Sequence, residues 1–367
     1  MPASDQLRTL TSLRAFAAAA IVVFHLQGTL VAVTPRPVWA TGVSFFFVLS
    51  GFVLTYAHAR GALDMRRFYA TRFARLWPLH LFSALAWLVV SQVGNATPFH
   101  WGWAETLDVL LLQAWVPLWG VVFAMNGVAW SISVEVFFYL LFPLLRGRWL
   151  APIFIAGAIA TAAILFAMDA FLAPAVPPYP TPAAGEFWSV HAALQFPVLR
   201  LLEFCLGVAT AKLFLSRRIR PNTTMELCAI AGVLAFAFAS EPLRVALADL
   251  GFSHVGLWLS QSGGLFVFAA AIFIFAHESG AISRVLRART LVLLGDISFS
   301  TYMLHWVVLS AFLKFGRPEG IAPWLWVAMF VLAVYAASYF AWRFIELPSK
   351  RWILARAARK DAAPSLA

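Results

Sequence analysis

Ionisable side chains inside long apolar runs are the first candidates for chemistry in this sequence, because each is costly in a bilayer and persists mainly for a function. Arg14 and His25 lie eleven residues apart in the first apolar run. That spacing is about three helical turns, so a helix would carry both side chains on one face. His25 is predicted to act as a general base on a substrate hydroxyl, since imidazole titrates near neutral pH. Alternatively, it is a neutral histidine bonded to a neighbouring helix, and Arg14 is an arginine that reaches the membrane interface.

Glu135 is the expected partner of His25. It follows Trp130 and Ser133 in the fourth apolar run and is predicted to lie at the depth of His25. A carboxylate there would orient the imidazole and stabilise its charged form; the alternative is a hydrogen bond that only holds two helices together. Trp130, Ser133 and His305 are candidate donors to a tetrahedral oxyanion, and His305 could equally be a hydrogen-bonding residue between helices.

Four more charged residues lie at the ends or within the apolar runs. Arg200 and Glu203, one helical turn apart, either pair with each other or line a polar cavity that opens outward. Arg72 and Arg75 are three residues apart, at the cytoplasmic mouth of the third span, and share a helical face. Their guanidinium groups could bind phosphates in a bidentate manner, although positive charge alone also marks a cytoplasmic loop.

These side chains must be positioned by membrane-spanning helices. Of the 367 residues, 62% are hydrophobic and only 12% are charged, and the mean hydropathy is +0.83. A soluble domain has about twice that share of charged residues, so the sequence predicts an all-α polytopic membrane protein in the lipid bilayer. Ten runs are long enough to span it; they fall near 10–30, 39–58, 76–93, 128–145, 149–171, 195–215, 225–241, 255–277, 291–313 and 323–345.

The distribution of basic residues predicts the orientation. With ten spans and both termini in the cytoplasm, most of the 27 Lys and Arg residues fall in cytoplasmic segments. The apolar run 107–125 is either an eleventh span or a segment on the outer face. An eleventh span would move every later loop to the opposite side of the membrane, with the basic loops outside, so the segment on the outer face is preferred. The net charge of +11 therefore indicates orientation, with no nucleic acid as a partner. Residues 1–352 are predicted to form one transmembrane domain, and 353–367 a short basic and polar cytoplasmic tail.

Other kinds of site are not indicated. Cys205 and Cys228 lie within apolar runs, and no histidine or cysteine spacing suits a metal, so no metal site is predicted. Walker and Rossmann glycine patterns are absent from the sequence, so nucleotide hydrolysis is not expected. Glu346 lies four residues before Lys350 and is expected to form a local ion pair with it.

Several motifs, in order from about residue 8 to 352, resemble those of the acyltransferase-3 family of membrane acyltransferases. Beside Arg14 and His25 they are Gly42 to Phe52, Arg72-x-x-Arg75 before Trp77-Pro78, Trp130-Ser131-x-x-x-Glu135-x-x-Phe138-Tyr139, Gly295-x-Ile297-Ser298-x-Ser300-x-Tyr302-x-x-His305, and Ile345-Glu346-x-Pro348. Val136 and Ser44 stand where the family usually has acidic residues. These departures bear on the acceptor more than on the reaction.

The resemblance implies a ten-span fold that transfers an acyl group, commonly acetyl from acetyl-CoA, to a hydroxyl of a carbohydrate or similar acceptor in a bacterial inner membrane. Acyl-CoA would be a substrate from the cytoplasm, held by Arg14, Arg72 and Arg75, and no cofactor would be bound permanently. The acceptor would arrive from outside. His25, or a serine such as Ser50, could instead carry the acyl group transiently. The candidates for contacting the oxyanion or the acceptor are Trp130, Ser133, Arg200, Glu203, His305 and Ser50.

Two other classes of function fit some of these features. A secondary transporter of a small polar or sugar-like solute would also have many spans with buried charges. Transporters often have corresponding halves, and none are visible in the sequence. A non-catalytic scaffold in envelope assembly is the third possibility. The acceptor, the acyl length and the oligomeric state are left open by the sequence.

Overall fold

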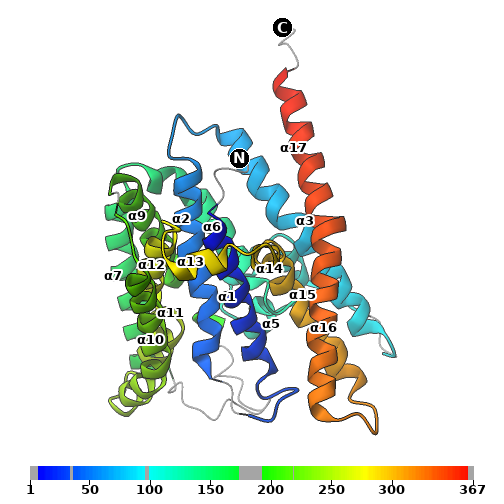
Figure 1. Ribbon diagram of the computed structural model, residues 1–367. Coiled ribbons are helices and arrows are strands. Elements are labelled where there is room, and N and C mark those ends of the chain that lie inside the picture. Colours follow the sequence, from blue (N-terminus) through cyan, green and yellow to red (C-terminus); the bar gives the residue numbers. More distant parts are fainter. Residues whose placement is uncertain (1–6, 34–35, 96–98, 173–191, 218, 363–367) are drawn as a thin grey trace.

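The computed structural model describes residues 7–33, 36–95, 99–172, 192–217 and 219–362, and in these ranges the chain is helical, without a strand. Figure 1 shows the helices packed side by side as one bundle, which confirms the all-α class. In chain order the elements are α1 (Arg8–Leu26), η2 (Pro37–Thr41), α2 (Gly42–Ala57), α3 (Met65–Gln92), α4 (Trp103–Val109), η3 (Gln113–Trp115), α5 (Trp119–Val122), α6 (Trp130–Arg146), α7 (Leu150–Phe171), η4 (Pro197–Arg200), α9 (Leu201–Ser216), α10 (Thr223–Asp249), α11 (Ser253–Ser262), α12 (Leu265–Phe275), α13 (Ala281–Leu286), α14 (Arg289–Asp296), α15 (Ser298–Phe315), α16 (Pro323–Ala341), η5 (Trp342–Glu346) and α17 (Leu347–Ala362).

Seven helical stretches of the described chain are long and apolar enough to cross a membrane. The consecutive helices α14 and α15, bent by 59° at their junction, make an eighth if they count as one span. Two further helices, α6 and α9, have 17 and 16 residues and are shorter than a typical span. Each of the ten predicted runs is therefore helical, and the count of ten spans stays a prediction.

The run 107–125 does not form a spanning helix. It is divided among α4, η3 and α5, and Leu111 and Met125 have a left-handed backbone with φ of 58° and 50°. The hydroxyl of Ser133 in α6 donates to the carbonyl oxygen of Leu111 at 2.7 Å, which fastens this segment to the bundle. The preference for a non-spanning segment is thus confirmed.

The third helix begins earlier than the apolar run predicts. Asp64 caps α3 by accepting a hydrogen bond from the backbone N–H of Arg67 at 3.0 Å, and the helix starts at Met65. Arg72 and Arg75 therefore lie about two to three turns inside a helix.

Glycines let the central helices approach closely. A side chain on Gly51 of α2 would strike the carbonyl oxygen of Phe204, and one on Gly207 of α9 would strike that of Val48. Gly295 of α14 meets the backbone of α1 in the same way. Small residues at such contacts are the main means of close helix packing in membranes. They bring α2 against α9, and α14 against α1, next to the polar residues described below.

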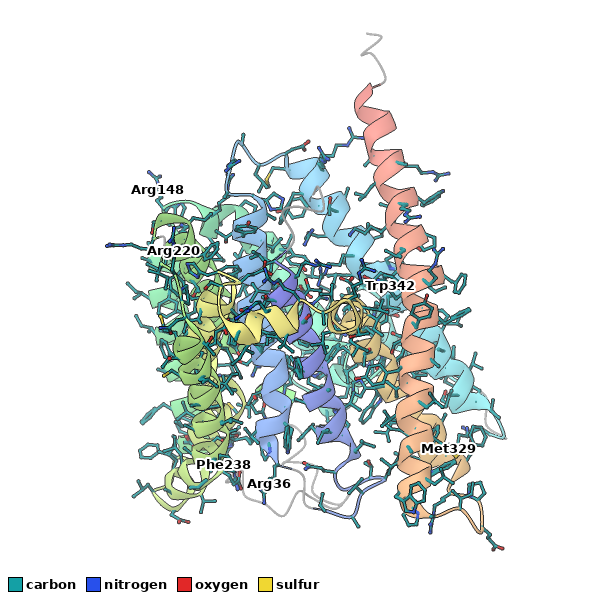
Figure 2. The ribbon with its side chains drawn as sticks, in the orientation of Figure 1. Arg36, Arg148, Arg220, Phe238, Met329 and Trp342 are labelled. Carbon is teal, nitrogen blue, oxygen red and sulfur yellow. The ribbon has the colours of Figure 1, made fainter. Side chains whose placement is uncertain are left out.

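The chain ends in one long helix. It passes from α16 through the π-helical turn η5 into α17, which extends beyond the bundle at the top of Figure 1. The predicted domain boundary at residue 352 falls inside α17, and 363–367 lie outside the described residues. Figure 2 places Arg148 and Arg220 at this same end and Arg36 at the opposite end. This separation agrees with the assignment of the first two to the cytoplasm and of Arg36 to the outside.

Candidate active site

A polar cavity lies between α1, α2, α3, α6 and α15. Its empty space is about 720 Å³, counting the open space at its mouth. Its walls are largely apolar, and its polar lining residues are Arg14, Ser50, Arg72, Arg75, Ser131, Glu135, Tyr139 and Tyr302.

Three arginines from two helices line this cavity. Arg14 comes from α1, while Arg72 and Arg75 come from one face of α3. The guanidinium of Arg72 lies 5.5 Å from the ring centroid of Tyr139, and that of Arg75 lies 5.8 Å from the ring centroid of Phe299. Nε of Arg72 and Nε of Arg75 are buried and have no hydrogen-bond partner within the described residues. The three predicted phosphate ligands are therefore together, with donors that an anion could use.

Glu135 lies in this cavity and not beside His25. Its carboxylate accepts a hydrogen bond from the hydroxyl of Ser50 at 3.0 Å and another from the hydroxyl of Tyr139. In the described part of the chain no hydrogen bond joins Glu135 to His25, so the predicted pair is not formed. Counting residues along the apolar runs misjudged the depth, because Glu135 shares the cavity with Arg14, which is about three turns from His25 along α1.

Glu346 brings a second carboxylate near the arginines. It accepts a hydrogen bond from the hydroxyl of Ser300 in α15 at 3.2 Å. The local ion pair expected with Lys350 is not formed within the described residues. The carboxylate of Glu346 instead bonds across to α15 through Ser300.

His25 is paired with His305 of α15. Nε2 of His305 lies 3.1 Å from Nδ1 of His25. Nδ1 of His25 is also 3.0 Å from the carbonyl oxygen of Ile21, and Nδ1 of His305 is 3.2 Å from that of Thr301. A carbonyl oxygen can only accept, so each Nδ1 carries a hydrogen, and Nε2 of His305 accepts from His25. Nε2 of His25 then keeps its lone pair, as a general base requires.

The ring of Tyr302 lies between the cavity and the histidine pair. Tyr302 lines the cavity, and its ring centroid is 5.9 Å from that of His305, one turn further along α15. Its hydroxyl donates to the carbonyl oxygen of Val128 at 2.9 Å and lies 2.7 Å from Oγ of Ser131. Tyr302 therefore contacts both the cavity and the histidine pair.

The remaining predicted site residues make other contacts, and within the described residues none of them bonds to His25. Arg200 and Glu203 form a buried ion pair, with 3.0 Å between Nη2 and Oε1, as the local alternative predicted. The guanidinium of Arg200 also lies 5.8 Å from the ring centroid of Trp130. Ser133 donates its hydroxyl hydrogen to the segment before α6. Of the candidates for acceptor or oxyanion contact, Ser50 reaches the cavity and His305 reaches His25.

Three residues of the site were missed by sequence reasoning. Tyr139 and Tyr302 lie four and three residues from Glu135 and His305, and this helical spacing was the available signal for both. Glu346 was assigned to a local ion pair because of its spacing to Lys350, and its hydrogen-bond partner Ser300 is 46 residues away in the sequence.

Apolar helices around a cavity with three arginines, beside a histidine pair, define a membrane protein that can hold an anion next to a base. Residues 8–343 match the acyltransferase domain family model. The chain therefore belongs to the acyltransferase-3 family, and with its apolar helices it is a multi-pass membrane acyltransferase.

Curated relatives agree with this class. The chain is similar to acyltransferase MdmB of Streptomyces mycarofaciens, with 29% identity over 337 residues that cover 84% of this chain and 80% of the relative. It is also similar to O-acetyltransferase OatA of Staphylococcus aureus, with 24% identity over 370 residues, 93% of this chain and 57% of OatA. Peptidoglycan O-acetyltransferase OatA of Listeria monocytogenes is 24% identical over 378 residues, 94% of this chain and 56% of that protein. The chain thus spans little more than half the length of either OatA. No solved structure matches the chain.

Proposed function

We propose that the protein moves an acyl group, acetyl first of all, from cytoplasmic acyl-CoA to a hydroxyl of a carbohydrate or similar acceptor on the outer side of a bacterial inner membrane. The observation that carries the proposal is the position of the arginine cavity beside the His25–His305 pair, with Tyr302 between them. The family supports acyl transfer, and the similarity to the O-acetyltransferases OatA supports O-acetylation.

The arginines suit the phosphates of acyl-CoA. Guanidinium groups bind phosphate through paired, charge-assisted hydrogen bonds. The buried Nε atoms of Arg72 and Arg75 are donors for such bonds, and Arg14 adds a third charge. With its phosphates there, the pantetheine arm would extend along the apolar wall toward Tyr302. Acyl-CoA is a substrate in this scheme, and no bound cofactor takes part.

His25 would act as the general base. Its Nε2 takes the proton of the acceptor hydroxyl while the hydroxyl oxygen attacks the thioester carbonyl carbon. The C–S bond then breaks, and CoA leaves as a thiolate that takes the proton from the imidazolium. The hydrogen bond from Nδ1 to the carbonyl oxygen of Ile21 supports the imidazolium, which is the role first assigned to Glu135. Glu135 would instead offset the charge of the arginines when no phosphate is bound.

Labelled acetyl-CoA and protein in nanodiscs test this function. Acceptor-dependent release of free CoA and transfer of label to peptidoglycan oligosaccharides or simple sugars are expected for the wild type. His25→Ala should lose both, because the variant lacks the proposed general base. His277→Ala is the matched control: its ring packs against Phe214, away from the cavity, and its activity should be normal.

Two results would contradict the proposal. CoA release that persists in His25→Ala would remove His25 from the reaction. Proton- or sodium-coupled uptake of a solute, without any CoA turnover, would instead support the transporter. Label that remains on the protein would indicate an acyl-enzyme, for which Ser50 and His25 are the candidates.

A further inference from the structure

A second buried polar cluster lies apart from the arginine cavity, where α3, α4 and η3 meet the segment before α6. Its side chains are His80, Ser83, Asp108, Gln113 and Asn126, and all five are fully buried. None of the five lines the arginine cavity, and the proposed reaction does not use them.

Hydrogen bonds within the cluster determine which atoms donate. Asn126 donates through Nδ2 to the hydroxyl of Ser83 at 3.0 Å and to a main-chain carbonyl of α15 at 2.9 Å. Gln113 donates through Nε2 to Oδ2 of Asp108 at 3.3 Å, and His80 donates through Nε2 to the carbonyl oxygen of Asp108 at 2.9 Å. If the nitrogen and oxygen of either side-chain amide were exchanged, an amide oxygen would face another oxygen: Oδ2 of Asp108 for Gln113, and the α15 carbonyl oxygen for Asn126. The other polar atom of each of these three side chains is therefore an acceptor.

The polar atoms left over are all acceptors. Oδ1 of Asp108, Oε1 of Gln113, Oδ1 of Asn126 and Nδ1 of His80 are buried and have no hydrogen-bond partner in the described ranges. Nε2 of His80 is 3.6 Å from Oδ1 of Asp108, which is too far for a hydrogen bond. Buried acceptors beside a carboxylate need a donor or a positive charge, and the described residues of the cluster supply none to these atoms.

The basic side chain beside Asp108 is His80, with Nε2 3.6 Å from Oδ1. Within the described residues Asp108 forms no ion pair with a lysine or an arginine. A buried carboxylate without a lysine or arginine beside it needs a proton or a cation to neutralise its charge.

We propose that the cluster binds one monovalent cation, Na⁺, through Oδ1 of Asp108, Oε1 of Gln113 and Oδ1 of Asn126. Carboxylate and amide oxygens are hard ligands that suit such an ion. One carboxylate balances the single charge of Na⁺. Ca²⁺ has two charges and takes about six to eight oxygen ligands, more than the cluster offers. The described residues contain no group of three His, Cys, Asp or Glu that could hold a metal. The proposed site differs from such a group because two of its three ligands are amide oxygens.

The ion ties the non-spanning segment to the helix that carries His305. Asp108 and Gln113 belong to α4 and η3, and Asn126 follows α5. Asn126 also donates to the carbonyl oxygen of Met303, two residues before His305. The inference rests on these contacts alone and does not depend on the proposed function.

Binding of ²²Na⁺ to the purified wild-type protein in detergent tests the proposal. We expect saturable binding of one ion per chain, displaced by NaCl and not by choline chloride. Tm should rise by several degrees when NaCl replaces choline chloride at equal ionic strength. Asp108→Asn should lose both effects, and Gln113→Leu should weaken binding about tenfold, as expected for the loss of one ligand. Glu319→Gln, which changes an exposed carboxylate, is the control and should behave as the wild type.

Three results would overturn the cation site. If the wild type binds no ²²Na⁺ and has one Tm in both salts, no ion is bound. If binding survives in Asp108→Asn, the ion lies elsewhere. If Asp108→Asn is as stable as the wild type in NaCl, a proton neutralises Asp108. The wild-type measurement needs no variant to fold, and CoA release measured on the same sample tests the proposed function separately.

Discussion

At the scale of single residues, Arg72 and Arg75 carry the assignment of the donor site. Arg72→Ala and Arg75→Ala should each raise KM for acyl-CoA about tenfold or more, since a charge-assisted hydrogen bond contributes about 1.5–3 kcal/mol. KM for the acceptor should not change, because the arginines are expected to contact the donor alone. Steady-state kinetics with each substrate varied in turn measure both constants.

The control for this pair is Arg148→Ala. Figure 2 places Arg148 at the end assigned to the cytoplasm, and it does not line the cavity. Its replacement removes the same charge from the same end of the molecule and should leave both KM values unchanged. Equal increases for donor and acceptor in the Arg72 or Arg75 variants would remove the phosphate assignment.

Glu135 and Glu203 are both carboxylates within helices, but their partners differ. Glu203→Gln leaves Arg200 buried and charged without its partner, which should cost about 3–5 kcal/mol and lower Tm. Glu135→Gln keeps an acceptor for Ser50 and Tyr139, so Tm should stay near the wild-type value. Its kcat should fall, because arginines without a counter-charge would release CoA more slowly. Thermal unfolding in detergent and kinetics in nanodiscs measure the two effects, and an equal loss of Tm in both variants would make Glu135 structural.

Sequence reasoning found most members of the site but not how they pair. The Arg72-x-x-Arg75 spacing fixes one face of one helix, and these residues do share a cavity with Arg14. The pairing of His25 with His305, and of Glu135 with Ser50, joins residues of different helices. Such pairs depend on the depth and rotation of each helix, and neither helical periodicity nor the length of an apolar run determines those two quantities.

At the scale of elements, the contact between α2 and α9 depends on two glycines. Gly51→Ala or Gly207→Ala would set a methyl group against the backbone of the facing helix and force the helices apart. Either variant should lower Tm and also reduce activity, because α2 carries Ser50 and lines the cavity. Gly120→Ala is the control, since a methyl group there meets open space. A normal Tm in Gly51→Ala and Gly207→Ala, measured by thermal unfolding in detergent, would contradict this packing.

The elements themselves were largely predictable, and their irregularities were not. All ten apolar runs are helical, because a span must satisfy its own backbone hydrogen bonds in lipid. The early start of α3 depends on the cap at Asp64, and the run 107–125 is broken into short elements around a left-handed Leu111. The bend between α14 and α15 and the π-helical turn η5 come from tertiary packing, so apolar run length cannot reveal them.

At the scale of the whole molecule, the reaction requires the arginines to lie nearer the cytoplasm than the histidine pair. A membrane-impermeant maleimide can test this orientation on a chain whose Cys205 and Cys228 are replaced by alanine. Figure 2 places Arg148 and Arg220 at one end of the molecule and Arg36 at the other. Arg36→Cys should therefore react in intact cells, whereas Arg148→Cys and Arg220→Cys should react only after the cells are opened. The reverse pattern would put the cavity's basic end outside, where acyl-CoA is not made, and the donor assignment would fail even if every contact in the site were correct.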